Sequence, residues 1–224
     1  MIQQSRIFEV FEQQFGNRRF LYTKNLVPGS RVYGEKLVFE NGIEYREWDP
    51  TRSKLAAAIL KGCQNIGLRK GDVVLYLGAA TGTTVSHVSD IVGKDGFIFA
   101  LDFAPRVVRE LFYVALERKN MTPLLEDAHK PLSYADKICA VDLVYQDIAQ
   151  KDQVNIFLKN CDLFLKQDGF GLLMVKSRSI DITQKPKQIY IKVRQELEKR
   201  INVVDARTLD PFELDHCFFL CKKK

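Results

Sequence analysis

The stretch Val73-Val74-Leu75-Tyr76-Leu77-Gly78-Ala79-Ala80-Thr81-Gly82-Thr83-Thr84 runs from an apolar block into a turn of small residues. Residues 73–77 are apolar and partly β-branched, and so short a run is typical of a buried parallel strand. The small residues after it let the backbone turn sharply, and a helix is predicted at 84–92. A strand that enters a helix through such a turn is the first part of a βαβ unit.

The same alternation of strand and helix continues from residue 52 to residue 200. Ser53 is a good N-cap for a helix at 54–60, and Pro105 and Pro186 suit the first turn of later helices. Further strands are predicted at 97–101, 123–126, 141–146 and 169–175. Further helices are predicted at 105–119, 153–166 and 186–200. With right-handed crossovers, this order predicts a doubly wound, mostly parallel sheet covered on both faces.

Both ends of the chain depart from this pattern. Segments 203–209 and 216–221 are strand-like with no helix between them, which predicts a C-terminal antiparallel hairpin within the sheet. This Rossmann-like architecture is usual for methyltransferases that use S-adenosylmethionine. Strands at 6–11, 19–24, 36–40 and 43–48, with the hairpin signal Asn41-Gly42, predict a small, mainly β N-terminal part. We therefore expect a β domain over residues 1–50 and a methyltransferase domain over residues 51–224.

Composition limits the class of protein. The chain has 224 residues, of which 46% are hydrophobic and 28% are charged, enough to form a sizeable core. Its longest apolar stretches, 96–103 and 170–175, fall far short of the roughly 18 residues that span a bilayer. The first six residues lack the basic-then-apolar order of a signal peptide. A cytoplasmic location without membrane contact is expected.

The five cysteines are scattered and form no C-x-x-C pair, so we expect reduced, mostly buried thiols and no metal site. The formal net charge of +6 favours a polyanionic partner such as RNA. Basic residues cluster at 185–200 and at Arg18, Arg19 and Lys24, although a solvated helix face is the favoured explanation. No stacked-aromatic signature of a sequence-reading RNA module is visible.

The candidate binding residues follow the ends of the predicted strands, where open α/β sheets bind their ligands. Gly78 and Ala79 open the small-residue turn, and Asp102 with Phe103 follows the second strand. A carboxylate at Asp102 can accept hydrogen bonds from both hydroxyls of an adenosine ribose. Asp127-Ala128 and the run Asp147-Ile148-Ala149-Gln150 follow the third and fourth strands. These features fit an NAD site as well as an S-adenosylmethionine site.

Two lysines are expected near the same crevice. Lys176 follows the fifth strand and Lys54 begins the helix before the first strand, so both can reach Asp147. Each lysine taken alone is more simply a solvated surface residue. Two lysines and one carboxylate at one crevice favour a catalytic site.

Several long, ungapped segments resemble the fibrillarin family: 45–59, 75–88, 147–150 and 211–216, together with Lys176. The similarity covers nearly the whole chain, and the length without a Gly/Arg-rich N-terminal tail resembles the archaeal form. The resemblance implies an RNA-guided ribose 2′-O-methyltransferase that uses S-adenosyl-L-methionine. It also implies a box C/D ribonucleoprotein containing a Nop-domain scaffold protein, a guide RNA and a kink-turn-binding protein, with rRNA or tRNA as the substrate.

The resemblance also implies roles for individual residues. Thr83 and Thr84 would contact the methionine part of the cofactor, and Asp102, where many relatives have Glu, would hold its ribose. The adenine would lie beside Phe103, Asp127 and Ala128, and the sulfonium beside Asp147, Ile148, Ala149 and Gln150. The catalytic set would be Lys54, Asp147, Lys176 and His216. Related ribose methyltransferases have Glu in place of this His, so the role of His216 stays open.

Lys176 is expected either to accept the 2′-hydroxyl proton or, as an ammonium, to stabilise the developing alkoxide. Two other functions remain open from the sequence. A subunit that binds the cofactor but mainly completes a ribonucleoprotein would not need Lys54, Asp147 and Lys176 together. An NAD-dependent oxidoreductase would need the full glycine fingerprint, which is incomplete here.

Overall fold

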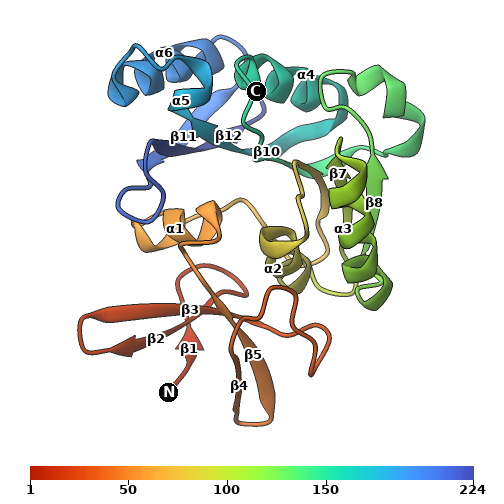
Figure 1. Ribbon diagram of the computed structural model, residues 1–224, viewed down its shortest axis with the longest axis vertical. Helices are drawn as coiled ribbons and strands as arrows, with labels where there is room; N and C mark the ends of the chain where they lie inside the picture. The colour runs from red at the N-terminus through yellow and green to blue at the C-terminus, as the bar shows by residue number, and fades with distance from the viewer.

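A computed structural model describes residues 1–224, and its central feature is a seven-stranded sheet in the order β11-β12-β10-β9-β6-β7-β8 (Figure 1). The strands are β6 (Val73–Leu77), β7 (Phe97–Asp102), β8 (Met121–Leu125), β9 (Val141–Gln146), β10 (Leu165–Lys176), β11 (Asn202–Thr208) and β12 (His216–Lys222). Neighbours from β10 to β8 are parallel, whereas β12 is antiparallel to both β10 and β11. The predicted Rossmann-like sheet with a C-terminal antiparallel hairpin is confirmed.

Helices cover both faces of this sheet, as Figure 1 shows. They are α1 (Lys54–Leu60), α2 (Thr83–Val92), α3 (Pro105–Glu117), α4 (Gln153–Phe164), α5 (Ser177–Ile180) and α6 (Pro186–Glu198), with a 3-10 helix η1 at Pro131–Lys137. Alternate strand residues face opposite cores, so Tyr76 packs with α1 and α2 while its neighbour Leu77 packs with α4 and α6. Helices α5 and η1 are short and were not predicted from the sequence.

The first fifty residues form a separate antiparallel sheet in the order β1-β2-β3-β5-β4. Its strands are β1 (Gln3–Gln4), β2 (Phe11–Phe15), β3 (Arg18–Lys24), β4 (Leu37–Glu40) and β5 (Ile43–Trp48). The hairpin between β4 and β5 turns at Asn41 and Gly42, whose φ values of 52° and 77° suit the two central positions of a type I′ turn. The hairpin prediction is confirmed.

The strand predicted at 6–11 is wrong for all but its last residue, because β2 begins at Phe11. The side chain of Gln4 donates hydrogen bonds to the carbonyls of Ile7 and Val10, at 2.8 and 3.0 Å, and closes a turn there. Glu9 within this turn has a φ of 55°, which no strand residue adopts. Local side-chain bonding therefore overrides the β propensity of the segment.

The five-stranded sheet shares a buried polar cluster with α2. Arg46 on β5 is fully buried and donates to Glu35 at 2.6 Å and to Asp90 of α2 at 2.8 Å. Arg118 donates to the other oxygen of Asp90 at 2.7 Å. Trp48 stacks on His87 of α2, with ring centroids 4.8 Å apart. The two sheets are therefore joined through buried ions and a common apolar core.

Four of the five cysteines, all but Cys139, are buried, and all five are free thiols, as expected from their spacing. No helix combines the length and the apolar character that a bilayer-spanning segment requires.

Candidate active site

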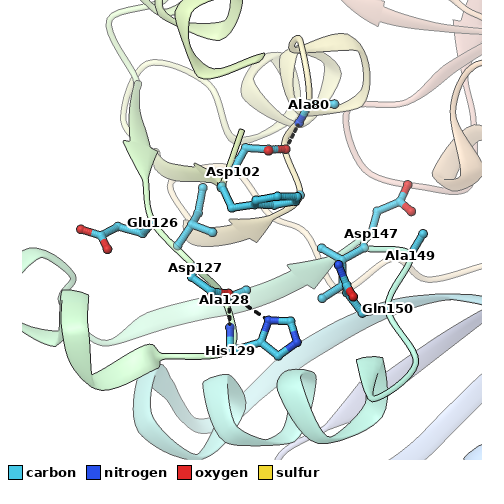
Figure 2. A pocket seen from close by; sticks show the side chains of 13 residues that line it. Ala80, Asp102, Glu126, Asp127, Ala128, His129, Asp147, Ala149 and Gln150 are labelled. Carbon is cyan, nitrogen blue, oxygen red and sulfur yellow. Dashed lines mark hydrogen bonds and ion pairs between the residues drawn. The ribbon is translucent and has the colours of Figure 1, made fainter. Parts of the chain in front are cut away.

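A cavity of about 350 Å³ opens at the carboxyl ends of β6, β7, β8 and β9 (Figure 2). The chain places β7 on one side of β6 and β9 on the other, so the cavity lies where the strand order reverses. Its lining residues are Gly78, Ala80, Leu101, Asp102, Phe103, Glu126, Asp127, Ala128, His129, Asp147, Ile148, Ala149 and Gln150.

Gly78 makes the close approach of the β6 and β9 ends possible. It has a φ of 82°, and a Cβ atom on it would lie 2.4 Å from the carbonyl oxygen of Asp147. The main chains are joined here, because the N–H of Asp147 donates to the carbonyl of Leu77 at 2.9 Å. A residue larger than glycine would push the 147–150 loop away from the turn.

Asp102 is held in place by the main chain around it. Its Oδ2 accepts a hydrogen bond from the N–H of Ala80, and its Oδ1 accepts one from the N–H of Ala104, both at 3.1 Å. Figure 2 shows the carboxylate turned toward Ala80 at the cavity wall. A carboxylate has about four acceptor sites, so both oxygens can accept a further hydrogen bond from a diol. Phe103 follows at the rim and is 67% exposed, leaving an aromatic face for a planar ring.

Asp127 and His129 form the wall opposite Asp102. The Oδ1 atom of Asp127 accepts hydrogen bonds from the main-chain N–H of His129 at 3.0 Å and lies 2.9 Å from its Nδ1. The main-chain bond, with a further contribution from the ring, lowers the pKa of Asp127. The other ring nitrogen of His129 lies 3.2 Å from Asp152, so the ring connects the β8 loop to the start of α4. Oδ2 of Asp127 accepts no hydrogen bond of this kind and lies 3.9 Å from the Nζ of Lys130.

Lys54 and Asp147 meet at the edge of the cavity. The Nζ of Lys54 donates to Oδ2 of Asp147 at 2.9 Å, and both side chains are about one-fifth exposed, at 21% and 22%. Lys54 is the first residue of α1, whose N-cap Ser53 accepts hydrogen bonds from the N–H of Ala56 and the hydroxyl of Thr84. Lys54 thus reaches Asp147 as expected, whereas Lys176 makes no hydrogen bond or ion pair with Asp147 and does not line the cavity.

His216 and Lys176 are directly opposite one another in the β10–β12 ladder, so their side chains project from the same face. The Nδ1 of His216 lies 2.7 Å from the carbonyl of Leu214, and it must carry the hydrogen because a carbonyl only accepts. Burial lowers the pKa of His216, and the charge of Lys54 lowers it further. His216 is therefore neutral at pH 7 and has an acceptor lone pair on Nε2, whereas Lys176 is exposed.

The structure brings most of the predicted binding residues into one cavity. Those that line it are Gly78, Asp102, Phe103, Asp127, Ala128, Asp147, Ile148, Ala149 and Gln150. Ala79, within the turn, and Thr83 and Thr84, at the start of α2, are absent from the lining; Ala79 is buried, and Thr84 bonds to Ser53. Contacts from these three to a ligand therefore stay a prediction.

Four further residues that were not predicted from the sequence also line the cavity: Ala80, Leu101, Glu126 and His129. Ala80 lies within the small-residue turn, and Leu101 and Glu126 directly precede residues that were chosen, so adjacency could have found them. His129 directly follows Ala128, so adjacency could have found it as well, but its orientation depends on its bonds to Asp127 and Asp152. No group of three or more His, Cys, Asp or Glu side chains is arranged to hold a metal ion.

The sequence model of the family described as Fibrillarin matches residues 1–224. The chain belongs to the fibrillarin family. A relative from Thermococcus gammatolerans, called fibrillarin-like rRNA/tRNA 2′-O-methyltransferase, is 50% identical over 201 residues, which are 90% of this chain and 89% of the relative.

Two solved fibrillarin structures share the fold. The fibrillarin of Aeropyrum pernix, crystallised with natively bound S-adenosyl-L-methionine, is 42% identical with a TM-score of 0.91 over 99% of this chain and 97% of that one. A structure of a fibrillarin/Nop5p complex is also 42% identical, with a TM-score of 0.87 over 97% of this chain and 99% of that one.

Proposed function

We propose that this protein transfers the methyl group of S-adenosyl-L-methionine to ribose 2′-hydroxyls of rRNA or tRNA. The observation that carries the proposal is the Lys54–Asp147 ion pair at 2.9 Å, because Asp147 also lines the cavity. An ion pair at the mouth of a cofactor-sized cavity suits a group-transfer enzyme better than a subunit that only binds the cofactor. Membership of the fibrillarin family supports the same reaction.

The cavity residues fit the cofactor group by group. Asp102 has acceptor capacity left for the two ribose hydroxyls, and Asp127 has Oδ2 for the exocyclic amine of adenine. Phe103 offers its ring face to the base. The cofactor supplies an activated methyl on a sulfonium. Thr83 and Thr84, at the start of α2, would hold the methionine portion, where free helix N–H groups favour a carboxylate.

The catalytic residues would align the ribose oxygen and manage its proton. Asp147 offsets the charge of Lys54 and fixes it at the mouth. Lys176, as an amine, would accept the 2′-hydroxyl proton or, as an ammonium, stabilise the developing oxyanion. Neutral His216, opposite Lys176 in the β10–β12 ladder, keeps an acceptor lone pair on Nε2, which would accept a hydrogen bond from the substrate or from Lys176.

The target is selected, in this proposal, by a box C/D guide RNA. A Nop-domain scaffold protein would dock the enzyme, and a kink-turn-binding protein would complete the particle. The solved fibrillarin/Nop5p complex supports the scaffold. A cytoplasmic location is part of the same proposal.

The test is reconstitution of the chain with its scaffold, kink-turn protein and guide RNA, followed by mapping of ribose methylation. Lys176→Ala should lower turnover by roughly 10²- to 10⁴-fold, the usual contribution of a proton-transfer group. Lys159→Ala, at an exposed position on α4, is the matched control and should leave turnover unchanged. Wild-type turnover in Lys176→Ala would remove this lysine from the mechanism. Cofactor binding without methylation by the wild-type particle would favour a structural subunit instead.

A further inference from the structure

Gln153, the first residue of α4, is a polar side chain with no exposed surface. Its carboxamide bonds to two separate segments near the mouth of the site. Nε2 donates to the carbonyl of Gln150 at 2.7 Å and, over a longer 3.4 Å, to the carbonyl of Lys176. Oε1 accepts a hydrogen bond from the N–H of Lys176 at 3.2 Å.

The position of Lys176 explains why these bonds are needed. The pairing of β10 with β9 ends at Leu173 opposite Gln146, so Lys176 extends three residues beyond the last paired position. On the other edge of β10, the N–H of Ser177 donates to Asp215 of the segment that leads into β12. The N–H and carbonyl of Lys176 point away from β12, on the edge where no strand pairs with them. Without Gln153 these two groups would have no hydrogen-bond partner. The carboxamide replaces such a strand through a two-point contact.

The bond to Gln150 connects the same side chain to the cofactor cavity. Gln150 ends the 147–150 loop, which lines the cavity and begins with Asp147. The position of Gln153 is itself fixed, because the buried Gln146 donates to its main-chain carbonyl at 2.6 Å. The two glutamines thus join the end of β9, the start of α4 and the end of β10.

We infer that Gln153 is a positioning residue that sets the distance between the 147–150 loop and Lys176. This inference rests on the proposed function and deepens it. Methyl transfer is an in-line displacement, and its rate depends on how closely the acceptor oxygen, its proton acceptor and the donor are aligned. The carboxamide of Gln153 bonds both the 147–150 loop and the main chain of Lys176, so it fixes the position of Lys176 relative to that loop.

The test compares Gln153→Met, which keeps the length of the side chain but removes its hydrogen bonds, with the wild type in the reconstituted particle. The single-turnover methylation rate at saturating cofactor should fall by roughly 10- to 100-fold, as expected for misplacement by about 1 Å. The cofactor Kd, measured by calorimetry, should change by no more than about threefold, because the side chain of Gln153 does not line the cavity. Gln188→Met, at an exposed position on α6, is the matched control.

A purely structural role would lower the melting temperature of Gln153→Met and leave the rate of the folded particle within twofold of wild type, which would overturn the inference. Gln153→Glu keeps the size of the side chain and the acceptor for the N–H of Lys176, and it decides the matter if the Met variant does not fold. Its rate should lie below that of the wild type, and an unchanged rate would also overturn the inference. Failure of the wild-type particle to methylate RNA would instead contradict the proposed function.

Discussion

Both carboxylate oxygens of Asp102 accept main-chain hydrogen bonds, so the side chain is oriented before any ligand binds. Such preorganisation lowers the cost of binding, since no rotamer freedom is lost when the ligand arrives. The charge of the carboxylate matters as well, because hydrogen bonds to ionised acceptors are about twice as strong as those to neutral ones.

Asp102→Asn should therefore weaken cofactor binding without unfolding the protein. The amide is similar in shape but has lost the charge and one acceptor oxygen, so we expect the S-adenosyl-L-methionine Kd to rise about 10- to 100-fold. Calorimetry with the purified chain measures this directly. Asp168→Asn, at an exposed position near the start of β10 and at the opposite end of the strands from the cavity, is the control. An unchanged Kd would show that the ribose lies elsewhere.

His87 is a second side chain whose surroundings determine its behaviour. It is fully buried, with Nδ1 2.8 Å from the hydroxyl of Thr23 and Nε2 2.7 Å from the hydroxyl of Tyr33. Burial, followed by the charges of Arg46 and Arg118, holds its pKa well below the usual value. The ring is therefore neutral in the folded protein.

This predicts an acid-sensitive contribution to stability. As pH falls below about 6.5, the unfolded chain binds a proton at this histidine and the folded protein does not, so folding loses up to about 1.4 kcal/mol per pH unit. His87→Gln should remove that dependence, and urea unfolding between about pH 5 and 6.5 measures it. Parallel pH profiles of wild type and variant would contradict the assignment of a neutral His87.

At the scale of secondary-structure elements, the turn from β6 to α2 requires glycine at position 78. Gly78 and Gly71 have nearly equal φ values, 82° and 84°, but a Cβ at Gly71 would meet nothing within 4 Å. Replacement of either by alanine costs about 1–2 kcal/mol of backbone strain. Only the replacement at Gly78 also forces the Asp147 carbonyl aside.

Gly78→Ala should lower the free energy of unfolding by roughly 1–3 kcal/mol more than Gly71→Ala does. It should also weaken cofactor binding, because the displaced loop lines the cavity. Chemical denaturation and calorimetry on the two variants separate the steric effect from the backbone effect. Equal losses in both variants would mean that the loop is free to move.

Elements defined by continuous apolar runs were predicted closely from the sequence. The strands at 73–77 and 141–146 have the predicted bounds, because a buried parallel strand has a characteristic composition. The turn at 6–10 was missed, since it depends on the side-chain bonds of Gln4. Local propensity contains no information about such bonds.

The candidate site divides in the same way. Residues directly after strand ends, such as Asp102 and Asp127, could be found because the topology brings those ends together. Gln153 could not, because its role comes from its bond to Lys176, a partner 23 residues away. Side chains that orient other groups show little in the sequence until the fold places their partners.

The molecule as a whole depends on ions buried between its two sheets. Arg46→Met would leave Glu35 without its buried partner and Asp90 with only Arg118, at a cost of roughly 3–5 kcal/mol. Arg194→Met, in an exposed pair on α6, should cost no more than about 1 kcal/mol.

Unfolding followed by the fluorescence of Trp48, the only tryptophan, and by far-UV circular dichroism tests this prediction. Trp48 lies at the junction of the sheets, so coincident transitions would show that both sheets unfold together. An Arg46→Met variant as stable as Arg194→Met would show that the buried ions contribute nothing net.

The buried cluster around Arg46 also limits how the two sheets can move. Charges buried between β5 and α2 cannot separate without solvent entering, so these ion pairs oppose a hinge motion at the junction. A macromolecule that binds the five-stranded sheet would therefore also fix the orientation of the cavity mouth. In a larger particle, binding of the first fifty residues by another component would orient the enzyme toward its target, although these residues lie far from the transferred methyl group.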